Sequence, residues 1–128
     1  MSSNVSDTIT VTINGKEQDV FMSFGLLNYL SSIVSDPSQV PAIPVTPVLR
    51  DGVLKALFAK RKKSGKVEEE VDYDDLDVSI EDAERALDFA MEHLTNFFIR
   101  ALKKVVAMSE RNREEMASLE SSLDGLKA

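Results

Sequence analysis

The sequence contains no cysteine. This absence excludes disulfide frameworks, thiol nucleophiles, iron–sulfur clusters and zinc–thiolate sites, and it suits a reducing compartment. The sequence also lacks any run near the roughly 18 consecutive apolar residues that a membrane-crossing helix needs. Residues 1–7 are polar and show no basic stretch followed by an apolar one, which is the pattern of a secretion signal. We therefore expect a soluble cytoplasmic chain that has no membrane partner.

Groups suited to catalysis are also scarce. The chain has one histidine, His93, inside the longest predicted helix, where a surface or partly packed role is the usual one. The acidic run at 68–77 lacks the glycine at the sixth position and the glutamate at the twelfth position that an EF-hand loop needs. No glycine-rich phosphate loop, Ser/His/Asp set or zinc-ligand spacing occurs. The sequence therefore predicts no enzyme, with no catalytic residue, no cofactor and no metal site.

Charge is divided unevenly along the chain, whose net charge is -7. Residues 1–66 carry eight Lys/Arg and five Asp/Glu, whereas residues 67–128 carry seven Lys/Arg and seventeen Asp/Glu. The acidic half would repel nucleic-acid phosphates, but such a dipolar chain can self-associate or dock onto a partner of mixed charge. The basic patch Lys60–Lys66 is the one segment suited to nucleic acid, yet the seven carboxylates of 68–77 can neutralise it and no aromatic residues are interleaved with it. We therefore expect self-association and protein partners before nucleic acid.

A β-hairpin is predicted over residues 8–21. Residues 8–13 alternate β-branched apolar and hydroxyl side chains, which places every second residue on one face. Asn14-Gly15 follows and tolerates the two positive φ angles of a type I′ turn, so that residues 16–21 return as the second strand. Because a lone two-stranded hairpin is marginal in water, we expect its apolar face to cover helices of this chain or to join strands of another subunit.

Helical and irregular segments alternate after the hairpin. Apolar residues recur at helical spacing after Ser23, which is available as an N-cap. All four prolines fall within eleven residues, a pattern typical of an extended connector. The acidic run cannot be buried and predicts a flexible segment. In order, the predicted segments are a helix at 23–35, a Pro-rich connector at 36–46, a helix at 47–63 and a charged linker at 64–78.

The strongest helical pattern begins at Ser79, a suitable N-cap that precedes acidic residues in the first turn. A three-to-four-residue apolar period then predicts one long amphipathic helix over 79–109. Its apolar residues are Ile80, Ala83, Leu87, Ala90, Met91, Leu94, Phe97, Phe98, Ala101, Leu102, Val105 and Met108. Beyond Ser109 the apolar stripe is thin, which predicts a polar tail or a short helix over 110–128. That thin stripe consists of Met116, Leu119, Leu123 and Leu126.

The predicted fold class is α+β and mostly α, with an N-terminal β-hairpin followed by three to four helices, including one long amphipathic helix. We expect a single domain over 1–128 with a disordered leader at 1–7. The long helix carries more apolar residues than a hairpin and two short helices need to cover. Ordinary core explains most of them, and the surplus predicts a surface for a second copy or for a client protein. The candidate partner-binding residues are Leu94, Phe97, Phe98 and Leu102.

The first 35 residues resemble a known family. The opening Val11-Thr12-Ile13-Asn14-Gly15-Lys16, the second strand, and an amphipathic helix that carries Phe24 and Leu27-Asn28-Tyr29-Leu30 resemble the start of the tail assembly chaperones of long-tailed bacteriophages. That family includes the lambda G protein. The remainder of the chain is similar to the family in character, being small, acidic and mostly helical with a polar, charge-rich C-terminal tail.

The resemblance implies a late, non-enzymatic viral protein of the bacterial host cytoplasm that is not retained in the mature virion. Such chaperones bind the tape measure protein, keep it soluble and help recruit tail tube subunits. A longer form, made by ribosomal frameshift near the end of the short form, often supplies the segment that recruits the tail tube protein. Gly125-Leu126-Lys127 can be encoded with a slippery heptamer that would permit such a frameshift.

Two other functions stay open. The chain could be a small nucleic-acid-associated regulator that uses Lys60–Lys66, or a structural head or tail completion protein that stays in the virion. The neighbouring genes would separate these functions, because a chaperone gene is expected directly upstream of a very long helical tape measure gene.

Overall fold

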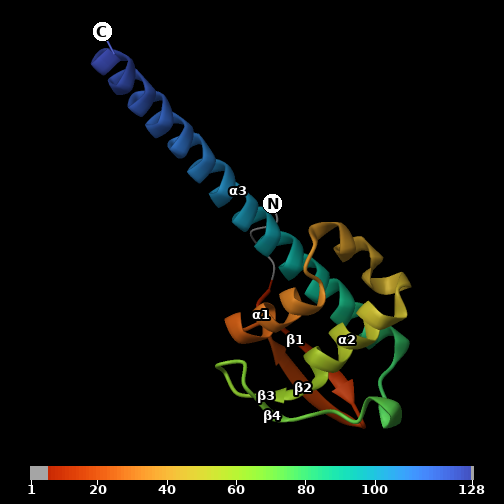
Figure 1. The fold of residues 1–128 in the computed structure, drawn as a ribbon. Coiled ribbons are helices and arrows are strands. Elements are labelled where there is room, and N and C mark those ends of the chain that lie inside the picture. The colour runs from red at the N-terminus through yellow and green to blue at the C-terminus, as the bar shows by residue number, and fades with distance from the viewer. Residues whose placement is uncertain (1–5, 128) are drawn as a thin grey trace. The chain divides into compact units, whose positions relative to one another are not determined.

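The computed structural model describes residues 6–127, and the side chains of residues 6–121 (Figure 1). Most of the expected leader at 1–7 therefore lies outside the described residues. The chain divides into two compact units, Met1–Asn96 and Phe97–Ala128. The described residues of the second unit, 97–127, all belong to one helix, so their backbone contacts run from turn to turn along it.

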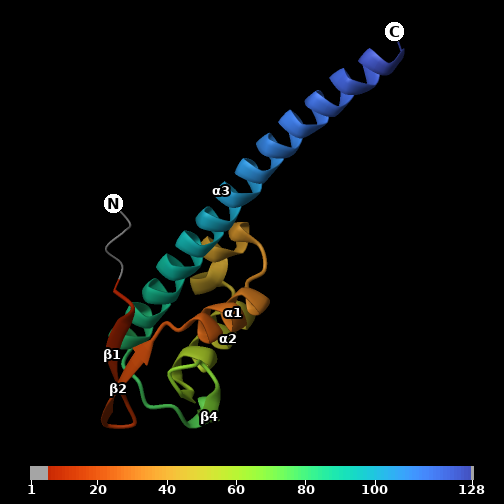
Figure 2. The same cartoon turned by 90° about the vertical axis from the view of Figure 1, so that its left-hand side faces the viewer.

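The N-terminal β-hairpin is confirmed. Strands β1 (Thr8–Ile13) and β2 (Lys16–Phe21) pair antiparallel in a two-stranded sheet. Asn14 and Gly15 have φ angles of 53° and 79°, which are the two positive values that a type I′ turn requires. Val11, Ile13 and Val20 are buried, and Figure 2 shows the hairpin beside the first turns of the long helix α3 (Ile80–Lys127).

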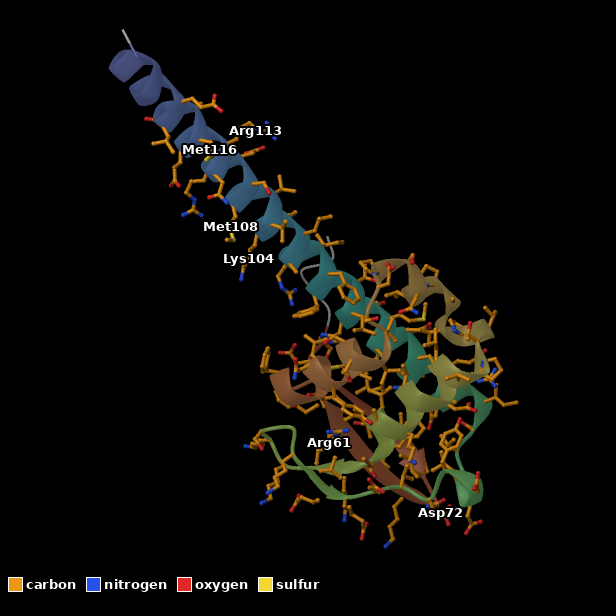
Figure 3. All side chains as sticks on the ribbon, viewed as in Figure 1. Arg61, Asp72, Lys104, Met108, Arg113 and Met116 are labelled. Carbon is orange, nitrogen blue, oxygen red and sulfur yellow. The ribbon has the colours of Figure 1, made fainter. Side chains whose placement is uncertain are left out.

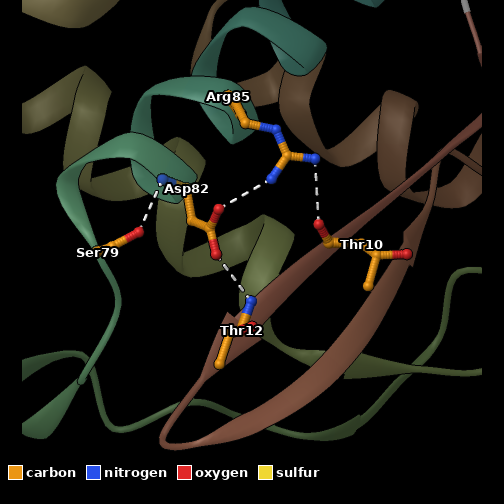
Figure 4. Close-up of polar contacts among 5 residues, drawn as sticks. All are labelled: Thr10, Thr12, Ser79, Asp82 and Arg85. Atoms are coloured by element: carbon orange, nitrogen blue, oxygen red, sulfur yellow. Dashed lines mark hydrogen bonds and ion pairs between the residues drawn. The ribbon is translucent and has the colours of Figure 1, made fainter.

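Side chains from the start of α3 cover the outer edge of β1 (Figure 4). The backbone N–H of Thr12 donates to Asp82 Oδ2 at 2.9 Å, and Arg85 donates from Nη2 to the Thr10 carbonyl oxygen at 3.2 Å. Arg85 also pairs with Asp82 at 2.8 Å. Two side chains thus take backbone groups of Thr10 and Thr12 that a third strand would occupy, and Ile13 at the end of this edge forms an isolated antiparallel bridge with Val78. Both features close the edge to a further strand.

Helix α1 (Phe24–Ile33) begins at the predicted N-cap, where the Ser23 hydroxyl accepts a hydrogen bond from the Leu26 backbone N–H. The Pro-rich segment that follows is not an extended connector but a 3₁₀ helix, η2 (Pro37–Val45). Asp36 and Gln39 form a capping box at its start, and the Ser38 backbone N–H, which bonds the Asp36 carboxylate, lowers the pKa of that group. Prolines fit this segment because their fixed φ lies within the 3₁₀ range.

Helix α2 (Pro47–Phe58) packs against α1 and ends earlier than predicted. Its expected last turn is instead strand β3 (Lys60–Arg61), which pairs with β4 (Val67–Glu69). The segment expected to be a linker at 64–78 therefore contains β4 and a short 3₁₀ helix, η3 (Tyr73–Asp75). Pairing between residues on the two sides of a turn supplies hydrogen bonds that the local charge pattern does not reveal.

A close approach holds the β3–β4 turn against the start of α1. Gly65 has a φ of +97°, and a Cβ atom placed on it would lie 2.7 Å from Gly25 Cα and 2.7 Å from Ser23 Oγ. Arg61 adds a hydrogen bond from Nη1 to the Gly65 carbonyl oxygen at 2.7 Å. Only residues without a side chain allow the two backbones to lie so close.

Helix α3 (Ile80–Lys127) is one continuous helix of 48 residues. It begins as predicted, with the Ser79 hydroxyl accepting from the Asp82 backbone N–H at 3.0 Å. The expected end near 109 does not occur, because no glycine or proline interrupts the chain between 80 and 124. The side chains of Leu123 and Leu126 lie outside the described residues.

The core of the first unit draws on the hairpin, α1, η2, α2 and the beginning of α3. Burial of such apolar side chains contributes about 1.5–3 kcal/mol each and holds these short elements together. The most completely buried side chains are Val11, Leu26, Leu30, Val34, Ile43, Val53, Leu57, Phe58 and Leu94.

Candidate interaction surface

Nearly all of the described side chains of the second unit, those of residues 97–121, are exposed to solvent. Every residue from Ile99 to Ser121 is exposed. The helix forms here because residues 97–121 contain neither glycine nor proline and are rich in strong helix formers such as Ala, Leu, Met, Glu, Lys and Arg. Apolar residues on such a helix have no core beneath them, so they are available to a partner.

The four candidate partner-binding residues fall into two environments. Leu94 is 0% exposed and belongs to the core of the first unit, so it is not part of an exposed surface in the single chain. Phe97 and Phe98 are half-buried and form an edge-to-face pair, with ring centroids 5.7 Å apart and an interplanar angle of 60°. Leu102 is 63% exposed. Three of the four residues therefore lie together in the second unit.

We define the apolar stripe as the exposed or half-buried apolar residues of α3 from Phe97 onward. Ile99 and Val106 belong to it, although the sequence analysis did not single them out because they fall outside the main three-to-four-residue period. Their spacing of seven residues is the signal that would have found them, since it places both on one helix flank. The stripe comprises Phe97, Phe98, Ile99, Leu102, Val105, Val106, Met108, Met116 and Leu119.

Charge changes sign along the stripe. Residues 97–108 carry three basic and no acidic side chains, whereas residues 109–120 carry four acidic and two basic ones. Figure 3 labels Lys104, Met108, Arg113 and Met116, all of which project from this helix. The apolar stripe is therefore flanked by positive charge in its first half and by mostly negative charge in its second half.

The basic patch Lys60–Lys66 is an ordered turn, and its arginine is used within the fold. Arg61 donates from Nε to the Ala56 carbonyl oxygen at 3.1 Å, and its guanidinium lies 5.4 Å from the centroid of the Tyr29 ring. Desolvation by burial lowers the pKa of Arg61. Lys60 pairs with Glu69 across the β3–β4 ladder. The exposed positive charges that could contact a phosphate group are therefore those of the lysines in the patch.

His93 has structural partners. Its Nε2 lies 2.8 Å from the Ser6 carbonyl oxygen, and its ring meets the Phe89 ring edge-to-face at 4.8 Å between centroids. The first contact ties α3 to the segment before β1, and the second lies between two residues one turn apart on α3 itself. Within the described part of the chain, no group of three or more His, Cys, Asp or Glu side chains is placed to hold a metal ion.

Comparisons with known protein families, with curated proteins and with solved structures find no match for this chain. Among the described residues, no helix combines the length and the apolar character needed to cross a membrane.

Proposed function

We propose that this chain is a non-enzymatic tail assembly chaperone, which binds the tape measure protein and keeps it soluble while the tail is built. The observation that carries the proposal is the apolar stripe of α3, which lies on a helix with no core of its own. An exposed apolar surface of this kind is typical of a protein-binding site and has no use in a self-contained domain.

The first half of the stripe suits a helical client. In residues 97–108, apolar side chains occupy more of the helix circumference than a two-helix contact needs, and the flanking charges are all basic. An amphipathic client helix can lay its apolar face on such a surface, with Phe98, Leu102 and Val106 as the anchors. Acidic residues at the edge of the client helix would meet Arg100 and Lys104.

The wider assembly role follows from the same resemblance. The chain would act in the host cytoplasm and leave before the virion matures. Recruitment of the tail tube protein would fall to a longer frameshifted form that shares these residues. The first unit, whose β-edge is blocked by Asp82 and Arg85, would serve as a folded anchor that resists strand pairing with an aggregation-prone client.

Nucleic-acid binding through Lys60–Lys66 has weaker support. Arg61 is engaged by Ala56 and Gly65, and Glu69 lies opposite Lys60 in the strand pair. The Arg61 donors are therefore used within the fold, and the Glu69 carboxylate brings negative charge to the strand that pairs with Lys60, which disfavours a phosphate backbone there. A structural role in the virion stays an alternative that the composition of purified virions would test.

Co-expression with the tape measure protein of the same phage tests the proposal. The wild-type chain should raise the soluble fraction of the client and co-purify with it. Val106→Asp and Phe98→Asp each place a charge in the binding face and should abolish co-purification, since burying an unpaired carboxylate is strongly unfavourable. Ala107→Asp puts the same charge on another face of the same helix and should retain binding.

A thermal unfolding measurement accompanies each variant. Val106 is 48% exposed, so its replacement should leave the melting temperature of the first unit unchanged. Undiminished client binding by both Val106→Asp and Phe98→Asp would overturn the proposed surface, and failure of the wild-type chain to bind the tape measure protein would overturn the chaperone function.

A further inference from the structure

The apolar stripe contains a regular seven-residue pattern. Phe98, Val105 and Leu119 fall at intervals of seven or fourteen, and Leu102 and Met116 form a second series four residues after the first. Alternating steps of four and three residues place both series on one face of a helix, which is the spacing of a coiled-coil seam. All of these seam residues except the half-buried Phe98 are exposed.

Two polar residues interrupt the seam at its middle. Ser109 occupies the series of Leu102 and Met116, and Asn112 occupies the series of Phe98, Val105 and Leu119. A second helix that covers the seam must satisfy both polar side chains, because an unpaired hydroxyl or amide is costly once it is removed from water. The interruption therefore selects among possible partners and orientations.

An antiparallel second copy satisfies this requirement. When two copies are aligned about the point between Glu110 and Arg111, each Ser109 faces Asn112 of the second copy. The amide and hydroxyl groups can then hydrogen-bond to each other. The apolar residues also face apolar residues, with Leu102 opposite Leu119 of the second copy and Val105 opposite Met116 of the second copy. Polar and apolar layers thus both match in a single register.

Charge complementarity favours the same orientation. The antiparallel alignment sets the basic half, residues 97–108, beside the mostly acidic half, residues 109–120, of the second copy. A parallel alignment would instead place the basic half of one chain beside the basic half of the second copy. It would also place Glu115 beside Glu120 of the second copy, at the flanking positions where like charges repel.

We propose that the second unit of α3 pairs with the same segment of a second copy of this chain, antiparallel, along Phe98, Leu102, Val105, Met116 and Leu119. The pairing does not rest on the proposed chaperone function. It leaves Ile99 and Val106 on the flank of the seam, opposite the charged Glu120 and Arg113 of the second copy. Those flanking residues stay accessible, whereas the proposed client anchors Phe98 and Leu102 lie in the seam. A client helix and a second copy would therefore compete for these two residues.

Light scattering of the purified full chain during gel filtration, over a range of concentrations, tests the pairing. We expect a particle of twice the 14.2 kDa chain mass that dissociates on dilution. Leu119→Asp should lower the mass to that of one chain at every concentration, because it puts a charge into the seam. Ala117→Asp, which adds the same charge on the outer face, should retain the pair. A single-chain mass for the wild type would overturn the pairing.

Disulfide trapping tests the orientation, helped by the absence of natural cysteine. Leu102→Cys and Leu119→Cys variants are oxidised separately and as a mixture. In the antiparallel pair, the two copies of residue 102 lie 17 residues apart along the axis, or about 25 Å at the helical rise. That separation is far beyond the reach of a disulfide. We therefore expect covalent dimers in the mixture alone, joining one chain of each variant.

The alternatives give different results. Covalent dimers of each variant by itself, with no preference for the mixture, would show a parallel pair and overturn the antiparallel register. Co-purification with the tape measure protein can be measured on the same Leu119→Asp sample. If that sample is a single chain and still binds the client, the pairing and the chaperone function are shown to be separate, and each stands or falls on its own result.

Discussion

The phenol hydroxyl of Tyr73 donates a hydrogen bond to the carboxylate of Asp51, with 2.8 Å between the two oxygens. This contact joins η3, in the acidic run, to helix α2. Desolvation by partial burial, together with this hydrogen bond, raises the pKa of Tyr73 to about 12. A segment that the charge pattern predicts to be a flexible linker is therefore tied to the folded unit by one of its own side chains.

The raised pKa predicts a loss of stability in alkali. The folded protein favours the neutral phenol, so the contribution of Tyr73 is complete below its usual pKa of 10.0 and is lost as the pH rises toward 12. Tyr73→Phe should remove the part of the stability loss in alkali that comes from ionisation of this phenol. The absorbance of tyrosinate measures the ionisation of Tyr73 directly in the Tyr29→Phe variant, where Tyr73 is the sole tyrosine. Ionisation of Tyr73 at its usual pKa in the folded protein would contradict the contact.

Asp82 should make the hairpin edge sensitive to acid. The Thr12 backbone N–H and then Arg85 hold the pKa of Asp82 below its usual 3.8, so its contribution is present above that value and is lost as the pH falls through the folded pKa. We expect Asp82→Ala to lower the melting temperature at neutral pH, with a smaller difference in acid. Glu81→Ala is the control, because it removes the neighbouring negative charge in the first turn of α3. If both variants lowered the melting temperature equally, Asp82 would act only through the helix dipole and not through its bond to Thr12.

Gly65 and Gly52 should respond to alanine in opposite directions. Gly65→Ala places an alanine at a positive φ and brings its Cβ into a clash with Gly25. It should lower the free energy of unfolding by about 1–3 kcal/mol. Gly52 lies inside α2, where an added Cβ would meet Ile33 Cγ2 at an ordinary 3.4 Å. Gly52→Ala should therefore stabilise by about 0.5–1 kcal/mol. Urea unfolding measures both changes, and a neutral Gly65→Ala would contradict the close approach.

Leu94 and Leu102 separate core from surface within one helix. Leu94→Ala removes a side chain that is 0% exposed and should cost about 2–5 kcal/mol of stability. Leu102→Ala changes a residue that is 63% exposed and should change the stability of the single chain by less than about 0.5 kcal/mol. Denaturant unfolding compares the two variants, at a protein concentration low enough to keep the chains apart. Similar losses would show that Leu102 is also core.

Features that depend on residues close together in the chain could be predicted from the amino-acid sequence. Asn14-Gly15 set the hairpin turn because few other pairs tolerate two positive φ angles. Ser23 and Ser79 marked the starts of α1 and α3, since each hydroxyl satisfies a backbone N–H three residues later. The apolar period of α3 likewise follows from the helical repeat. These are local effects, and they can be derived without knowing what lies nearby in space.

Features that depend on residues far apart in the chain could not be predicted and became visible only in the folded protein. The pairing of Lys60–Arg61 with Val67–Glu69, and the anchoring of Tyr73 by Asp51, require parts of the chain whose proximity no local pattern encodes. Leu94 and Leu102 show the same limit in the candidate surface. Both follow the same three-to-four-residue apolar period, but Leu94 is 0% exposed and Leu102 is 63% exposed, because burial depends on neighbouring elements and not on the period.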